Sequence, residues 1–171
     1  MQFVVLIVTS MVILAGCGGA TLQPQPTTDE ATPHTEVTLY FGDQQATGLV
    51  AEVREINVPE GSNLYALTLQ ALAEGSMRSD LARVLPEGTK ILGVEVEDGV
   101  AYADFSRELQ SGHWGGSAGE TITVFAIVNT LTEFDEVKRV AILIEGTPLD
   151  SLAGHMDMTE PLSRAEDLII D

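Results

Sequence analysis

Residues 90–105, KILGVEVEDGVAYADF, place two alternating runs of apolar residues on either side of Asp98-Gly99. This dipeptide favours a tight two-residue turn, so the stretch predicts a β-hairpin. If Glu97 pairs with Val100, one face carries three apolar pairs, namely Leu92 with Phe105, Val94 with Ala103 and Val96 with Ala101. The other face is expected to be wet and carries Glu95, Glu97, Tyr102 and Asp104. A hairpin with one apolar face needs a cover, and the two small alanines leave room for a helix.

The cover is predicted in residues 118–134, AGETITVFAIVNTLTEF, where apolar side chains recur at helical spacing. The β-branched content also fits a strand, but seventeen residues without a turn signal favour a helix. A second helix is predicted over residues 64–74, with Ser62 or Asn63 as its N-terminal cap and Gly75 at its end.

The remaining elements are mostly strands. Residues 37–41 and 49–58 predict two antiparallel strands, and residues 136–146 predict a central strand because both of its faces are apolar. A short helix is expected near residues 80–85, before Pro86, and the chain after residue 146 is expected to be irregular. The order β-β-α-(short α)-β-β-α-β predicts an α+β fold, a small mixed or antiparallel sheet with two main helices packed on one face.

The amino terminus carries the most specific short motif. An apolar run over residues 4–14 has the length of a signal-peptide core, and it ends in Leu14-Ala15-Gly16-Cys17, which resembles the bacterial lipobox. We therefore predict a lipoprotein signal peptide over residues 1–16, a lipid on Cys17, and a flexible Pro/Thr linker over residues 17–35. The run lacks the usual opening Lys or Arg, and the alternative is a buried amino-terminal segment with an inert thiol. Cys17 is the only cysteine, so no intrachain disulfide is possible.

The excess of acidic side chains limits the kinds of partner that the protein can bind. The 171 residues include 26 acidic and 8 basic side chains, a formal net charge of −18. Nucleic-acid binding depends on Lys and Arg releasing counterions, so no nucleic acid is expected as a partner. The acidic residues form no long block, which favours a role in solubility or adaptation to salt.

Residues 115–119, Gly-Gly-Ser-Ala-Gly, fit the Gly-x-Ser-x-Gly pattern of a hydrolase nucleophile elbow. An elbow needs a strand running into the turn, whereas the preceding residues indicate a helical turn or loop. Ser117 and Glu120 also fit a capping box, in which each side chain binds the other residue's amide at the start of a helix. We favour the cap over the nucleophile.

Other candidate catalytic or metal-ligating residues are isolated in the sequence. His34 falls in the linker, and His113 and His155 have no second ligand at metal spacing, so no metal and no cofactor are predicted. Asp104 and Asp157 have the chemistry of an acid–base pair, but no pattern brings them together. Trp114 is expected to be a hydrophobic plug beneath its loop rather than a ligand contact.

Several segments in order resemble the GerMN domain of a sporulation and spore-germination lipoprotein: LPEGTKIL, VEDGVAYADFSREL, GGSAGE, VNTLTEFDEVKRVAILIEG and GHMDMTEPLSR. The resemblance implies a small α/β domain over residues 36–164, followed by a C-terminal tail over residues 165–171. It also implies tethering outside the cytoplasmic membrane by a lipidated cysteine, here Cys17, and similarity to the ring-building modules of secretion machines. It transfers no catalytic residue.

The sequence therefore predicts an extracytoplasmic, membrane-anchored lipoprotein that is not an enzyme and that acts by binding an envelope protein or itself. Two alternatives stay open. The first is an extracytoplasmic serine hydrolase that uses Ser117, and the second is a module that binds an envelope glycan or peptide near Trp114.

Overall fold

The computed structural model describes residues 33–170. The predicted signal peptide, the predicted lipid site Cys17 and the predicted linker as far as residue 32 lie outside the described residues. Among the helices of residues 33–170, none combines the length and the apolar character needed to cross a membrane.

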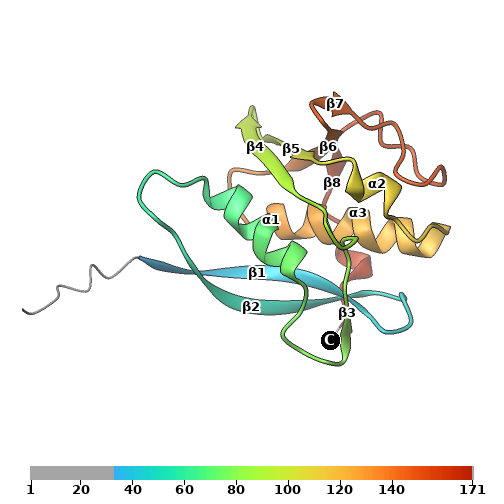
Figure 1. The fold of residues 1–171 in the computed structure, drawn as a ribbon, viewed down its shortest axis with the longest axis horizontal. Coiled ribbons are helices and arrows are strands. Elements are labelled where there is room, and N and C mark those ends of the chain that lie inside the picture. The colour runs from blue at the N-terminus through green and yellow to red at the C-terminus, as the bar shows by residue number, and fades with distance from the viewer. Residues whose placement is uncertain (1–32, 171) are drawn as a thin grey trace, which may run out of the picture. The chain divides into compact units, whose positions relative to one another are not determined.

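The strands form two sheets, with the two main helices between them (Figure 1). The first sheet has the order β2-β1-β3 and consists of β1 (His34–Asp43), β2 (Leu49–Asn57) and β3 (Leu81–Ala82). The second has the order β4-β5-β6-β7, with β8 also paired to β6, and consists of β4 (Ile91–Glu97), β5 (Val100–Phe105), β6 (Arg139–Ile144), β7 (Thr147–Pro148) and β8 (Leu162–Ser163). The helical elements are α1 (Leu64–Glu74), α2 (Glu108–Ser111), α3 (Ser117–Leu131) and the 3₁₀ turn η1 (Glu166–Leu168). The predicted α+β class is confirmed, with two main helices on one face of the mixed sheet β4-β5-β6-β7, and a second sheet lies on the other side of these helices.

The hairpin of β4 and β5 has the predicted register at its tip and a different one at its base. Glu97 pairs with Val100, and the next pairs follow as expected. The predicted pairing of Leu92 with Phe105 is wrong, because Ile91 takes that place and a β-bulge lies between Ile91 and Gly93. A bulge adds one residue to a strand and redirects its side chain. Leu92 accordingly leaves the core face and is 52% exposed.

The short helix expected near residues 80–85 is also absent, because this segment is extended and pairs as β3 with Gly42 and Asp43. Six residues make fewer than two helical turns, so a helix there gains little local stability and the pairing with β1 decides the conformation. The extended path buries Val84 and Leu85 completely. It also presents the Val84 carbonyl to the Thr123 hydroxyl of α3, which donates to it at 2.7 Å.

Helix α1 begins and ends where the sequence predicts. Of the two candidate caps, Asn63 is the one used, and its side-chain oxygen accepts from the Ala66 amide at 3.0 Å. The Asn63 amide nitrogen also donates to the Val94 carbonyl at 2.8 Å, which fixes the start of α1 to β4. Gly75 ends the helix with φ of 93°.

The chain after Arg164, predicted as a tail, is held against the domain. The Arg164 guanidinium donates to the Tyr40 hydroxyl at 2.5 Å and to the Asn129 carbonyl at 3.0 Å. It also lies 2.8 Å from the Glu133 carboxylate. Beyond it, the Ile170 amide donates to the Leu49 carbonyl at 2.8 Å. The stretch predicted to be irregular thus contains β7, β8 and η1.

At the amino-terminal end of the domain, His34 belongs to β1 rather than to the predicted linker. Its ring lies 3.8 Å from the Glu55 carboxylate.

Gly99 and Gly93, on the same hairpin, provide a matched test of the turn. Gly99 has φ of 78°, and an added Cβ there would lie 3.5 Å from its nearest neighbour, so only the backbone conformation opposes alanine. We expect Gly99→Ala to lower the free energy of unfolding by about 1–2 kcal/mol, the cost of a left-handed L-residue. Gly93→Ala enters open space and should leave stability unchanged or raise it by up to about 1 kcal/mol. Urea unfolding of both variants measures the difference, and equal losses would contradict this account of the turn.

Candidate functional site

The Gly-x-Ser-x-Gly segment forms the start of α3, but Ser117 does not cap the helix. The N-cap position is taken by Gly116, which makes no side-chain hydrogen bond, and Ser117 is the first helical residue. Gly115 and Gly116 have φ of 77° and 81°, which turns the chain sharply into the helix. The predicted capping box of Ser117 and Glu120 is therefore wrong, because the Glu120 side chain is used by a distant loop.

Glu120 is completely buried and holds the loop that follows β7. Its Oε1 accepts from the Ser151 hydroxyl and from the Ala153 amide, each at 2.8 Å. Its Oε2 accepts from the His155 amide, also at 2.8 Å. Three donors converge on one carboxylate in the first turn of a helix, where the helix dipole also favours a negative charge.

The pKa of Glu120 reflects two opposing effects. Burial raises the pKa of this carboxyl, while the Ala153 amide, the Ser151 hydroxyl and the His155 amide lower it. The donors prevail, so the pKa lies below the ordinary value for glutamate. Glu120 is therefore ionised at neutral pH and binds the loop as an anion.

Both ring nitrogens of His113 are occupied. The Thr123 hydroxyl gives its only proton to the Val84 carbonyl, so the contact at 3.2 Å is a hydrogen bond from Nε2–H of His113 to Thr123. Nδ1 of His113 accepts from the Gly115 amide at 3.0 Å. Burial lowers the pKa of His113 below its ordinary value. The ring is thus neutral and serves to fix the turn rather than to move a proton.

Trp114 stacks on His113, with ring centroids 4.9 Å apart and planes inclined by 21°. It also lies over Gly119, where an added Cβ would come within 2.6 Å of the indole nitrogen. The last glycine of the Gly-x-Ser-x-Gly pattern is therefore required by the close approach of Trp114. Since the indole is 53% exposed, it covers the first turn of α3 without being a buried plug.

Ser117 lacks the surroundings of a nucleophile. It is exposed, and within residues 33–170 its hydroxyl makes no hydrogen bond to a histidine or a carboxylate. The segment before it is α2 and a loop, so no strand runs into the turn. His155 meets this helix through its backbone amide, which binds Glu120.

The other candidates are not brought together by any described contact. Asp104 accepts from the Gly146 amide at 2.9 Å, whereas Asp157 accepts from the amide and hydroxyl of Thr159 at 3.0 and 2.6 Å. Each carboxylate thus belongs to its own turn. Within the described part of the chain, no group of three or more His, Cys, Asp or Glu side chains is arranged to hold a metal ion.

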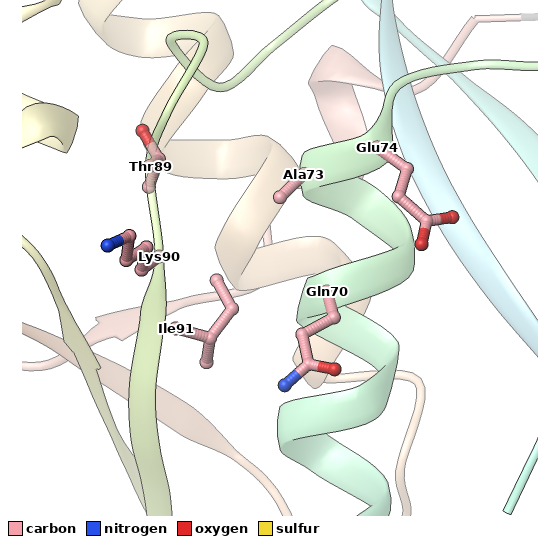
Figure 2. Close-up of a pocket in the computed structure, with 6 residues that line it drawn as sticks. All are labelled: Gln70, Ala73, Glu74, Thr89, Lys90 and Ile91. Atoms are coloured by element: carbon pink, nitrogen blue, oxygen red, sulfur yellow. The ribbon is translucent and has the colours of Figure 1, made fainter.

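A cleft between α1 and the start of β4 has a volume of about 420 Å³ (Figure 2). Its lining consists of Gln70, Ala73, Glu74, Thr89, Lys90 and Ile91. In Figure 2 the Lys90 amine and the Glu74 carboxylate point away from each other, and the Thr89 hydroxyl points away from α1. Ligand sites usually have polar groups that converge on one point, which these do not.

The sequence did not predict a hollow on the outer face of the second sheet. The bulge in β4 places Leu92 beside Gly93, and both line a hollow of about 270 Å³ together with Glu95, Tyr102, Asp104 and Leu143. The alternation of the hairpin predicted which residues face outward, but it carried no signal for the bulge.

Comparison with known proteins places this geometry among related domains. Residues 38–150 match the Germane family, described as sporulation and spore germination. No curated protein matches the sequence.

Three solved structures are similar. The tandem GerMN domains of the sporulation protein GerM from Bacillus subtilis share 25% identity with a TM-score of 0.62, over 77% of this chain and 46% of that one. The chain thus spans less than half of that two-domain protein. A putative lipoprotein from Clostridium perfringens shares 28% identity with a TM-score of 0.54, over 76% of this chain and 87% of that one. The first GerMN domain of GerM, at 24% identity and a TM-score of 0.61, over 76% of this chain and 98% of that one, supports the fold alone.

The corrected role of Glu120 predicts unequal effects of two substitutions in one helical turn. Glu120→Gln should lower the free energy of unfolding by about 1–3 kcal/mol, because a buried amide cannot accept from three donors. Ser117→Ala should change it by less than about 0.5 kcal/mol, because no cap is lost. Urea unfolding at pH 7 measures both changes. A larger loss of stability in Ser117→Ala than in Glu120→Gln would support the capping box and contradict this account.

The pH dependence of stability distinguishes the contribution of the ionised Glu120 carboxylate from the contribution of side-chain packing. Because the pKa of Glu120 is lower in the folded than in the unfolded protein, its contribution is complete above the unfolded value, about 4.3 for glutamate. This contribution is lost as the pH falls through the folded pKa. The difference in the free energy of unfolding between wild type and Glu120→Gln should therefore become smaller as the pH falls. A difference that does not change with pH would contradict the role of Glu120 as an anion.

Proposed function

Because the chain belongs to the Germane family of sporulation and spore germination, we propose that it is an extracytoplasmic lipoprotein whose single domain binds another protein and catalyses no reaction. The domain acts as a docking module held near a membrane by a lipid on Cys17.

Two observations support the anchor. The sequence Leu14-Ala15-Gly16-Cys17 resembles a lipobox and follows an apolar run of signal-peptide length. One similar structure, from Clostridium perfringens, is that of a putative lipoprotein. A single acyl chain binds membranes only marginally, so we expect Cys17 to carry more than one chain.

The surroundings of Ser117 carry the non-catalytic part of the proposal. Gly115 and Gly116 shape the turn into α3, and Gly119 makes room for Trp114. His113, a candidate base in the preceding loop, has both ring nitrogens engaged in holding this turn. Both glycines of the Gly-x-Ser-x-Gly pattern thus have a structural explanation that does not require a nucleophile.

The anchor is tested by Cys17→Ala in cells. The variant should leave the membrane fraction and lose incorporation of labelled palmitate, because the thiol that accepts the lipid is gone. Thr27→Ala, in the predicted linker, is the matched control and should behave as wild type. Retention of the Cys17→Ala protein in the membrane fraction would remove the main support for anchoring.

The absence of serine chemistry is tested with a fluorophosphonate probe. Wild type and Ser117→Ala should give the same background signal, because no base activates the hydroxyl. Labelling of the wild type that disappears in Ser117→Ala would establish a nucleophilic serine and overturn the docking proposal in favour of a hydrolase.

A further inference from the structure

The outer face of the second sheet combines exposed apolar side chains with carboxylates around one hollow. Cross-strand pairing puts Glu95 beside Tyr102, and Tyr102 beside Ala141 of β6. The next row is Gly93, Asp104 and Leu143. Directly paired residues share a face of the sheet, so these two rows form one surface. Both main helices lie on the opposite side of this sheet (Figure 1).

The hollow exists because of two local features of β4. The bulge turns Leu92 outward, where it is 52% exposed. Gly93 has no side chain, and a Cβ added there would meet nothing within 4 Å. The resulting depression of about 270 Å³ has Leu92, Tyr102 and Leu143 as its apolar wall. Leu92 and Tyr102 thus form a small exposed apolar patch beside Gly93, and a glycine within a strand often marks a site where a ligand or another backbone approaches closely.

The polar groups around the hollow are available to a partner. Among residues 33–170, the Glu95 carboxylate and the Tyr102 hydroxyl have no hydrogen-bond or ion-pair partner. Asp104 uses one oxygen to accept from the Gly146 amide at 2.9 Å, and its second oxygen is free within this part of the chain. The basic residue on the same face of β6 is Arg139, which lies four residues from Leu143, about 13 Å along the strand. The hollow itself is therefore acidic and apolar.

We propose that this outer-face hollow binds a segment of a partner protein that presents an arginine or lysine flanked by apolar residues. The aliphatic stem of such a side chain would lie on Leu92 and Leu143, and its cation would meet Glu95, Asp104 and the Tyr102 ring. Arginine suits this arrangement best, because its planar guanidinium both stacks on aromatic rings and pairs with carboxylates. The inference rests on the proposed docking function and specifies the chemistry of the partner.

The negative charge of the hollow and of the whole chain disfavours two other occupants, a second copy of this chain and an anionic lipid surface. A second copy of this chain also carries a net charge of −18 and would bring the same carboxylates to the contact. An anionic lipid surface would be repelled for the same reason. A basic segment is attracted by both the local carboxylates and the overall charge, which speeds association as well as fixing orientation.

The test uses the full lipidated chain in detergent and a fluorescein-labelled hexapeptide of alternating arginine and leucine. A hexapeptide with glutamate in place of arginine is the control ligand, and fluorescence anisotropy gives the affinity. Wild type should bind the arginine peptide at least about tenfold more tightly than the glutamate peptide. Equal binding of the two peptides, or no saturable binding of the arginine peptide, would overturn the proposal.

Three variants locate the binding. Gly93→Val fills the hollow without changing charge and should weaken binding by about tenfold or more. Glu95→Gln should weaken binding several-fold at low salt, with the difference shrinking at high salt. Glu36→Gln makes the same charge change on β1 of the other sheet and should stay within about twofold of wild type. Wild-type affinity in Gly93→Val, or equal losses in the two charge variants, would place the binding elsewhere.

Two controls keep the outcomes distinct. Thermal unfolding checks that Gly93→Val is folded, and Tyr102→Ser, at a side chain 39% exposed, replaces it if it is not. Sedimentation that shows self-association abolished by Gly93→Val would assign the face to a second copy and overturn the proposal. Failure of peptide binding with palmitate still on Cys17 and Ser117 unlabelled would reject this inference while leaving the proposed function intact.

Discussion

Helix α3 is buried on almost all sides between two sheets, and its polar side chains must therefore find partners inside the protein. The four buried ones each bind a different part of the chain. Glu120 holds the loop after β7, and Thr123 donates to the segment before β4. Asn129 exchanges two hydrogen bonds with Ala165, and Thr130 accepts from the Tyr40 amide of β1. The positions of the surrounding elements depend on these contacts as well as on apolar packing.

The same constraint explains why a local pattern misleads at the start of α3. Ser117 and Glu120 have the spacing of a capping box, and an isolated peptide would be expected to form one. In the folded protein three donors from residues 151–155 compete for the Glu120 carboxylate in a fully buried site, where charge-assisted hydrogen bonds are strong. The tertiary partners prevail, and two glycines take over the turn that a cap would have shaped.

The sequence predicts the parts of the fold that depend on neighbouring residues. The turn at Asp98-Gly99, the cap at Asn63 and the end of α1 at Gly75 all follow from local chemistry. It does not predict the bulge at Leu92, because a shifted and an unshifted register place similar apolar residues against Phe105. Nor does it predict the contacts of Arg164 with Tyr40, since 124 positions separate the two and neither side chain belongs to a local motif. For the same reason the partners of Glu120 could not be found from the residues around it.

The contacts of Arg164 and Ala165 with α3 determine when the domain can complete its folding. A chain is synthesised from its amino end, so α3 emerges long before the residues that satisfy Asn129. Until they arrive, a buried asparagine and the last carbonyls of the helix stay exposed or unmatched, and the core lacks its final support. The domain is therefore expected to remain loosely assembled until almost its whole length is available. Such a delay is compatible with the export proposed for this chain, because an exported polypeptide is threaded across the membrane before it becomes compact.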